Sequence, residues 1–174
     1  GYLPLRRFAK SEIVPSNKDR FLRKETLQGF VHDEASAFFG GLAGNAGLFS
    51  TARDVARVYQ MLLNGGEIDG QRYLSKETCQ LFTTETSKIS RRGLGFDKPD
   101  ADDPKKGNCA PAAPAEVYGH TGFTGTCAWV DPMNELVYVF LSNRIYPDVT
   151  NRKLNQLHIR ERIQGAIYDA MKKK

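Results

Sequence analysis

The sequence predicts an α+β fold, an antiparallel sheet of about three strands with flanking helices and a C-terminal helix packed on the sheet. Three observations lead to this fold class. Apolar runs at 116–120, 126–130 and 136–141 are typical of strands. One stripe of apolar residues has helical spacing over 51–64, and a second begins near residue 150.

The first 49 residues give the weakest signals. The stretch 17–28 is compatible with a short helix that ends at Gly29. In 38–49, glycine and alanine repeatedly interrupt apolar residues, which permits close backbone approach and positive φ but disfavours a regular helix. We therefore expect an irregular, tightly turned segment ahead of the first long helix.

The clearest helix follows this segment. Ser50 or Thr51 is a suitable N-cap, and Asp54 places a carboxylate near the positive helix end. A single apolar stripe is formed by Val55, Val58, Tyr59, Leu62 and Leu63. The sequence Asn64-Gly65-Gly66 predicts the stop. Beyond it we expect a tight turn at 68–71 and a second short helix over 76–82, capped by Ser75.

Periodicity is absent from 83 to 115. The part 97–114 contains four prolines and several charged residues, so we expect a flexible, exposed loop there. Its carboxylates are irregularly spaced, which argues against a calcium loop, and we predict no metal site in the chain. Regular structure resumes with the three strands.

The strand 116–120 is short, 126–130 alternates, and 136–141 is almost wholly apolar. Continuous apolar character is typical of a buried central strand, so we assign 136–141 to the middle of the sheet. The sequence Asp131-Pro132-Met133-Asn134 predicts a hairpin turn between the last two strands. From about residue 150, apolar residues at helical spacing predict an amphipathic helix that packs on the sheet.

Composition excludes several classes of protein. The chain has 174 residues and a formal charge of +5, but residues 1–150 are neutral and the excess lies in the last 24. No broad basic face is expected, and we predict no nucleic-acid partner. No apolar run is long enough to span a membrane. The three cysteines are too few for a disulfide framework, and we expect them to be buried thiols.

The segment 118–126, Tyr-Gly-His-Thr-Gly-Phe-Thr-Gly-Thr, carries the clearest chemical signal. It places the titratable His120 at the end of a strand, followed by the hydroxyl of Thr121 and by Gly122. Glycines let a ligand approach the backbone, and a free N–H there can stabilise an oxyanion. A glycine-rich hairpin with a structural histidine is an equal alternative from the residue types alone.

Several motifs in order favour the functional interpretation. The run 44–54, the helix stop Asn64-Gly65-Gly66, the turn 70–75, Gly93-Leu94-Gly95-Phe96 and 119–125 together resemble the serine β-lactamase and penicillin-binding-protein superfamily, on its class C and esterase-like side. The resemblance covers roughly residues 25–172. It implies a partial β-lactamase-like fold, with 1–174 as a single partial domain.

The resemblance also implies roles for particular residues. His120-Thr121-Gly122 is similar to the family's Lys-Thr-Gly element, whose first residue has a proton-relay and electrostatic role. Thr121 would bind a substrate carboxylate or carbonyl, and the N–H of Phe123 would be an oxyanion donor. These three are the expected catalytic residues. Gly122 and Thr124 are expected on the substrate side. His32 stands beside Asp33 and Glu34, and we expect a structural or substrate-side role for it, with a metal or acid–base cluster as the alternative. No cofactor is expected.

Two family elements are missing. No serine is followed by lysine three residues later, and no tyrosine by asparagine two residues later, so the nucleophilic Ser-x-x-Lys and the Tyr-x-Asn are absent. We therefore expect the C-terminal half of a serine hydrolase that acts on amides or esters through an acyl-enzyme, and no activity from this half alone. The alternative is a non-catalytic module of a larger envelope protein, for example one fused to a glycoside hydrolase. The two elements upstream of Gly1 would favour the enzyme.

The intact protein would act on a small-molecule or peptidoglycan-like substrate in the periplasm or elsewhere outside the cytoplasm. An incomplete sheet exposes a strand edge and apolar helix faces, so we expect this chain to self-associate. A monomer in analytical ultracentrifugation that binds no hydrophobic dye would contradict that expectation.

Overall fold

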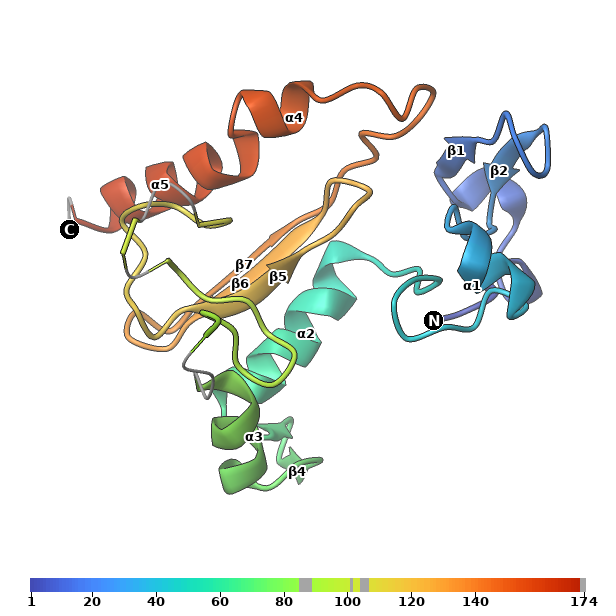
Figure 1. Cartoon of the computed structure of the whole chain (residues 1–174). Coiled ribbons are helices and arrows are strands. Elements are labelled where there is room, and N and C mark those ends of the chain that lie inside the picture. Colours follow the sequence, from blue (N-terminus) through green and yellow to red (C-terminus); the bar gives the residue numbers. More distant parts are fainter. Residues whose placement is uncertain (85–88, 101, 104–106, 173–174) are drawn as a thin grey trace.

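A three-stranded antiparallel sheet forms the centre of the computed structural model, which describes residues 1–84, 89–100, 102–103 and 107–172 (Figure 1). Its strands are β5 (Tyr118–Thr121), β6 (Cys127–Asp131) and β7 (Leu136–Phe140), in the order β5-β6-β7. The register pairs Tyr118 with Val130 and Asp131 with Leu136. The predicted α+β class, the three strands and the hairpin turn are confirmed.

The order of the strands corrects one prediction. β6, not the apolar run 136–141, is the central strand, and all five of its residues are buried. β7 lies at the edge and only Tyr138 in it is buried. Its apolar residues face helices on both sides, which is why it has the composition of a central strand. In the described part of the chain no further strand pairs with the outer edge of β7.

Helices cover both faces of the sheet. On one face α2 packs against β6 and β7, and Thr51 caps it by accepting a hydrogen bond from the N–H of Asp54, as predicted. Ser75 caps α3 in the same way, and a short β3–β4 hairpin precedes it. The bounds of these elements are α2 Ala52–Leu63, β3 Glu67–Ile68, β4 Gln71–Arg72 and α3 Lys76–Thr83.

The C-terminal segment covers the other face as two helices rather than the single one expected. They are α4 (Lys153–Gln156) and α5 (Ile159–Met171), separated at His158, which has φ 47°. α5 is attached to the sheet by two tyrosine hydroxyls. Tyr138 donates to the carbonyl of Arg160 (3.1 Å), and Tyr168 donates to the carboxylate of Asp131 (2.8 Å).

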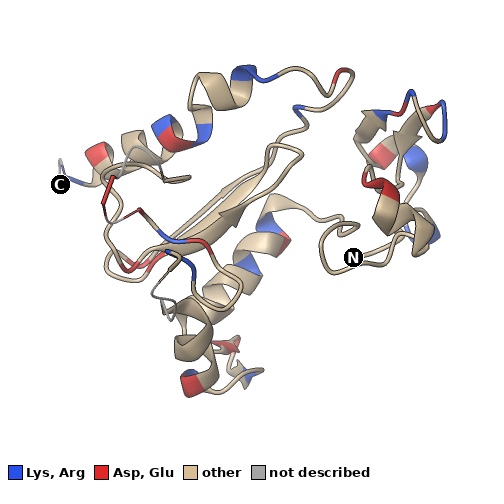
Figure 2. Cartoon of the chain, in the orientation of Figure 1, with Lys and Arg blue, Asp and Glu red and all other residues tan. Residues whose placement is uncertain are grey.

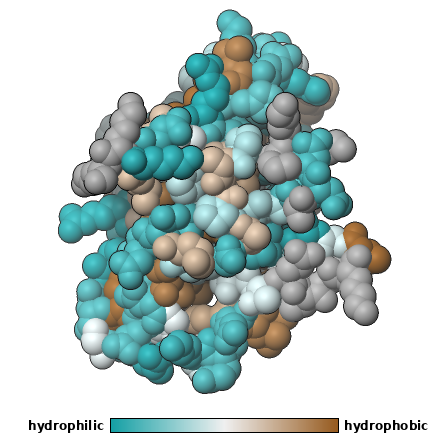
Figure 3. All heavy atoms as spheres, turned by 90° about the vertical axis from the view of Figure 1, so that its left-hand side faces the viewer, coloured by the Kyte–Doolittle hydropathy of each residue, from teal (hydrophilic) through white to brown (hydrophobic). Residues whose placement is uncertain are grey.

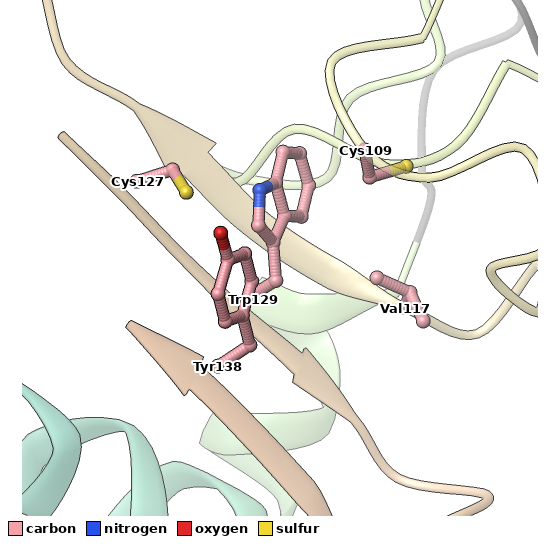
Figure 4. Close-up of a cluster of buried hydrophobic side chains, with 5 residues drawn as sticks. All are labelled: Cys109, Val117, Cys127, Trp129 and Tyr138. Carbon is pink, nitrogen blue, oxygen red and sulfur yellow. The ribbon is translucent and has the colours of Figure 1, made fainter. Parts of the chain in front are cut away.

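The core lies between the sheet and α5, whose Ile167 packs against it. Figure 4 shows the cluster beside the strands. Its buried residues are Cys109, Val117, Cys127, Trp129 and Tyr138. Cys79, Cys109 and Cys127 are all free and buried, as predicted. Burial raises the pKa of Cys109 to about 12 and that of Cys127 to about 11, so both are unreactive thiols at neutral pH.

The segment 97–114 differs from the exposed loop that was predicted. Four of its residues are buried, Asp97 and Lys98 at the start and Cys109 and Ala110 farther along, whereas 111–112 are exposed as expected. These buried residues contact β5 and α5, since Asp97 pairs with Gly119 and the N–H of Ala110 donates to Gln164. Residues 101 and 104–106 of this prediction lie outside the described residues.

The N-terminal part contains no helix over 17–28, so that prediction is wrong. The stretch forms two paired strands instead, β1 (Pro15–Lys18) and β2 (Thr26–Gln28). The carboxylate of Asp19 accepts hydrogen bonds from the N–H groups of Phe21 and Leu22 and from the side chain of Arg23, which fixes a turn. The remaining elements are the 3₁₀ turns Pro4–Arg6 and Lys10–Glu12 and the helix α1 (Glu34–Phe38).

Charge and hydropathy are distributed unevenly. Charged residues lie on helices, loops and the two small hairpins, while the central sheet carries only Asp131 (Figure 2). On the face shown in Figure 3, hydrophobic residues form several separate patches among hydrophilic ones. Among the described residues, no helix has the length and apolar character needed to cross a bilayer.

Candidate active site

The candidate site is built on the end of β5 and the turn that follows it. The N–H of Gly122 donates to the carbonyl of Thr126 (2.8 Å), and that of Gly125 donates to Gly122 (2.9 Å). Gly125 has φ 101°, which glycine tolerates best. The N–H of Arg144 donates to the carbonyl of Thr124 (3.0 Å). The turn is therefore held from within and by the chain that follows β7.

Gly119 lets β6 lie close against β5 just before the site. A Cβ at this position would lie 2.1 Å from the carbonyl oxygen of Ala128, so only glycine fits. The N–H and the carbonyl of Gly119 both bond to the backbone of Asp97, at 3.0 and 2.7 Å. In an antiparallel strand the residue two positions along presents its backbone groups to the same side. The backbone N–H and carbonyl of Thr121 therefore point to the same side as those of Gly119, away from β6.

His120 is exposed and makes two side-chain contacts. Its Nδ1 lies 2.6 Å from the carbonyl oxygen of Thr121, and its Nε2 lies 2.8 Å from the guanidinium of Arg92. The imidazole is thus anchored at the strand end rather than free in solvent.

Phe123 projects from the turn and is 58% exposed. The ring of His32 stacks on it, with centroids 5.3 Å apart and planes 6° from parallel. The guanidinium of Arg144 lies 4.7 Å from the centroid of the same ring, a cation–π contact. The fold therefore brings His32 into contact with Phe123.

The backbone N–H of Phe123 has the geometry of an available donor. In the part of the chain that the structure describes, it donates no hydrogen bond, whereas the neighbouring N–H of Gly122 is used within the turn. The side-chain hydroxyl of Thr121 likewise has no hydrogen-bond partner among the described residues. A free N–H and a free hydroxyl can each bind a carbonyl or a carboxylate.

Two residues of the site were missed in the sequence. Arg92 precedes the glycine motif 93–95, and Arg144 follows β7; neither belongs to the pattern that identified His120. The paired arginines at 91–92 next to that motif are the only signal that could have indicated the first. Among the described residues, no group of three or more His, Cys, Asp or Glu side chains could hold a metal ion.

The pKa of His32 predicts a pH effect. Burial is the main cause that lowers this pKa below its ordinary value; Asp33 raises it, and Arg23 and Arg144 lower it further. As the pH falls below about 6.5, the unfolded chain takes up a proton that folded His32 resists, so the free energy of unfolding decreases. We expect this loss between about pH 7.5 and pH 5, measured by urea denaturation.

The variant His32→Phe keeps a ring against Phe123 but cannot titrate, and should lose this part of the pH dependence. His158→Asn, at the exposed break between α4 and α5, is the matched control and should keep it. Asp19 does not interfere, since its hydrogen bond from Arg23 lowers its pKa to about 2. An unchanged slope in His32→Phe would contradict the assignment.

Comparisons with known proteins show which family the chain resembles. The model of the family described as Beta-lactamase matches residues 7–161. A protein of Escherichia coli K12 described as "Putative D-alanyl-D-alanine carboxypeptidase" is 34% identical over 161 residues, which cover 89% of this chain and 37% of that protein. A protein of Salmonella agona with the same description is 36% identical over 135 residues, 77% of this chain and 31% of its own length.

A crystal structure of a penicillin-binding-protein homologue from Caulobacter crescentus aligns with 54% of this chain and 26% of its own, at 26% identity and a TM-score of 0.44. The family model covers most of the chain and defines the class: this chain belongs to the Beta-lactamase family. It spans about a third of the length of the two curated relatives, so it corresponds to part of such a protein.

Proposed function

We propose that this chain forms the substrate-binding wall of a serine hydrolase that cleaves peptides ending in D-alanyl-D-alanine through an acyl-enzyme. The observation that carries the proposal is the end of β5, where His120 is anchored and where the hydroxyl of Thr121 and the N–H of Phe123 have no hydrogen-bond partner among the described residues. The relatives' description supports this substrate class. Such peptides occur in the cell wall, and we propose a periplasmic or other extracytoplasmic location.

Thr121, Phe123 and His120 would each have a different role in the reaction. An extended peptide would lie along the outer edge of β5 and bond to the backbone of Thr121. The N–H of Phe123 would stabilise the oxyanion that forms when a serine attacks the scissile carbonyl. His120 would take part in proton transfer beside that serine. The serine and its base belong to Ser-x-x-Lys and Tyr-x-Asn elements, which this sequence does not contain.

The experiment transplants this chain into the Escherichia coli relative in place of the segment it matches, and measures release of D-alanine from a D-alanyl-D-alanine peptide. We expect the chimaera to be active, and His120→Ala to reduce kcat/KM by about 10²–10⁴-fold. His158→Asn should leave the rate unchanged. The chain by itself should release no D-alanine and form no covalent adduct with a labelled penicillin.

Two outcomes would contradict the proposal. A folded chimaera without activity, beside an active parent, would favour the non-catalytic module. A covalent penicillin adduct on the 174-residue chain would show that a serine of this chain is itself acylated. That result would refute the proposal that this chain only binds the substrate and does not supply the nucleophile.

A further inference from the structure

The contacts of His120 determine which ring nitrogen carries the proton. A carbonyl oxygen only accepts hydrogen bonds, so the 2.6 Å contact with Thr121 requires a proton on Nδ1. A guanidinium only donates, so the 2.8 Å contact with Arg92 requires a lone pair on Nε2. One form of the ring satisfies both contacts, the neutral Nδ1–H tautomer.

Arg92 is held in place for this contact by its neighbour. The guanidinium of Arg91 forms a two-point ion pair with Asp97, with distances of 2.8 and 3.1 Å, and the carboxylate is 1% exposed. Asn108 donates a third hydrogen bond to the same carboxylate (2.8 Å). Asp97 in turn pairs through its backbone with Gly119, the residue before His120. The segment that carries both arginines is therefore attached to β5.

We infer that Arg92 is a positioning residue that holds His120 as the Nδ1–H tautomer, with the Nε2 lone pair directed at a permanent cation. The inference rests on the proposed function for its catalytic meaning. In the resembling Lys-Thr-Gly element, one lysine supplies both the charge and the exchangeable proton. Here the fixed positive charge lies on Arg92, and His120 is neutral, so it can take up a proton at Nε2 only in exchange for the contact with Arg92.

The test is a long-range ¹H–¹⁵N correlation spectrum of the uniformly labelled 174-residue chain at about pH 8.5, roughly two units above the ordinary imidazole pKa. Protonated and unprotonated ring nitrogens have well-separated ¹⁵N shifts. The chain has three histidines, and the signals lost in His120→Gln identify His120. We expect its Nδ1 to be protonated and its Nε2 to be unprotonated.

In Arg92→Met the donor to Nε2 is lost and only the contact of Nδ1 with Thr121 still favours the Nδ1–H tautomer, so the His120 signals should move part of the way toward the Nε2–H tautomer that prevails in free histidine. Arg92→Lys keeps a cationic donor and should restore the original shifts. The control Arg53→Met, at an exposed position on α2, should change neither nitrogen. Since Arg92 is exposed, all three variants should keep the far-ultraviolet circular dichroism of the parent.

A wild-type His120 protonated on Nε2, or identical shifts in the parent and Arg92→Met, would overturn the inference. The spectra do not depend on catalysis. An inactive chimaera with His120 in the expected tautomer would refute the proposed function alone, whereas an active chimaera with the other tautomer would refute the role of Arg92 alone.

Discussion

Replacing Trp129 by alanine is expected to lower the free energy of unfolding by about 3–5 kcal/mol, the largest stability effect of any single truncation in the sheet. Trp129 lies in the central strand β6, is 1% exposed and occupies the middle of the core cluster (Figure 4). Truncation leaves a large cavity between the sheet and α5 that neighbouring side chains cannot fill. Urea denaturation followed by circular dichroism measures the loss, since the variant has no tryptophan.

Two comparisons make this prediction specific. The indole Nε1 has no hydrogen-bond partner among the described residues, so Trp129→Phe removes an unsatisfied donor as well as volume, and should cost only about 1 kcal/mol. Phe21→Ala removes an aromatic ring that is 85% exposed and should change stability by less than about 0.5 kcal/mol. Equal losses in Trp129→Ala and Phe21→Ala would mean that the cluster is not the core.

Replacing Arg91 by methionine is expected to cost about 3 kcal/mol, because it leaves a buried carboxylate without its cation. Burial raises the pKa of Asp97, but the hydrogen bonds from Arg91 and Asn108 outweigh this effect and hold the pKa below its ordinary value. A lowered pKa means that the pair stabilises the fold above about pH 4 and that this contribution is lost as the pH falls further. The difference between the parent and the variant should therefore shrink on acidification.

A double variant tests whether the cost comes from the unpaired charge. Asp97→Asn removes that charge, so Arg91→Met with Asp97→Asn should be more stable than Arg91→Met alone. The matched control is Glu67→Gln in the half-exposed pair of Glu67 with Arg72, where the expected change is below about 1 kcal/mol. Additive losses in the double variant would contradict a coupled buried pair.

Much of the fold could be predicted because the signals are local. Thr51 and Ser75 cap helices where the sequence places them, and the turn at 131–134 joins two strands as expected. A cap or a tight turn is formed by side chains within a few residues of one another, and so it is determined by short stretches of sequence. The helix predicted over 17–28 failed because the carboxylate of Asp19 bonds to the following N–H groups and stabilises a turn.

In the site, too, some residues could be identified from local sequence and others could not. His120, Thr121 and Phe123 are adjacent in sequence, and their glycine-rich setting identified them. Arg92 and Arg144 reach the same turn from distant segments, and no spacing rule relates them to His120 or Phe123. Their positions depend on the buried pair of Asp97 with Arg91 and on the chain that follows β7.

The sequence by itself determined the α+β class, the strands and capped helices, and the motif that marks a Beta-lactamase family chain. Only the tertiary structure decided that β6 rather than β7 is central, and that His32 and Arg144 enclose Phe123. It also decided which nitrogen of His120 carries the proton. The physical reason is that strand order and ring protonation depend on partners far away in sequence, whose contacts form only when the chain packs.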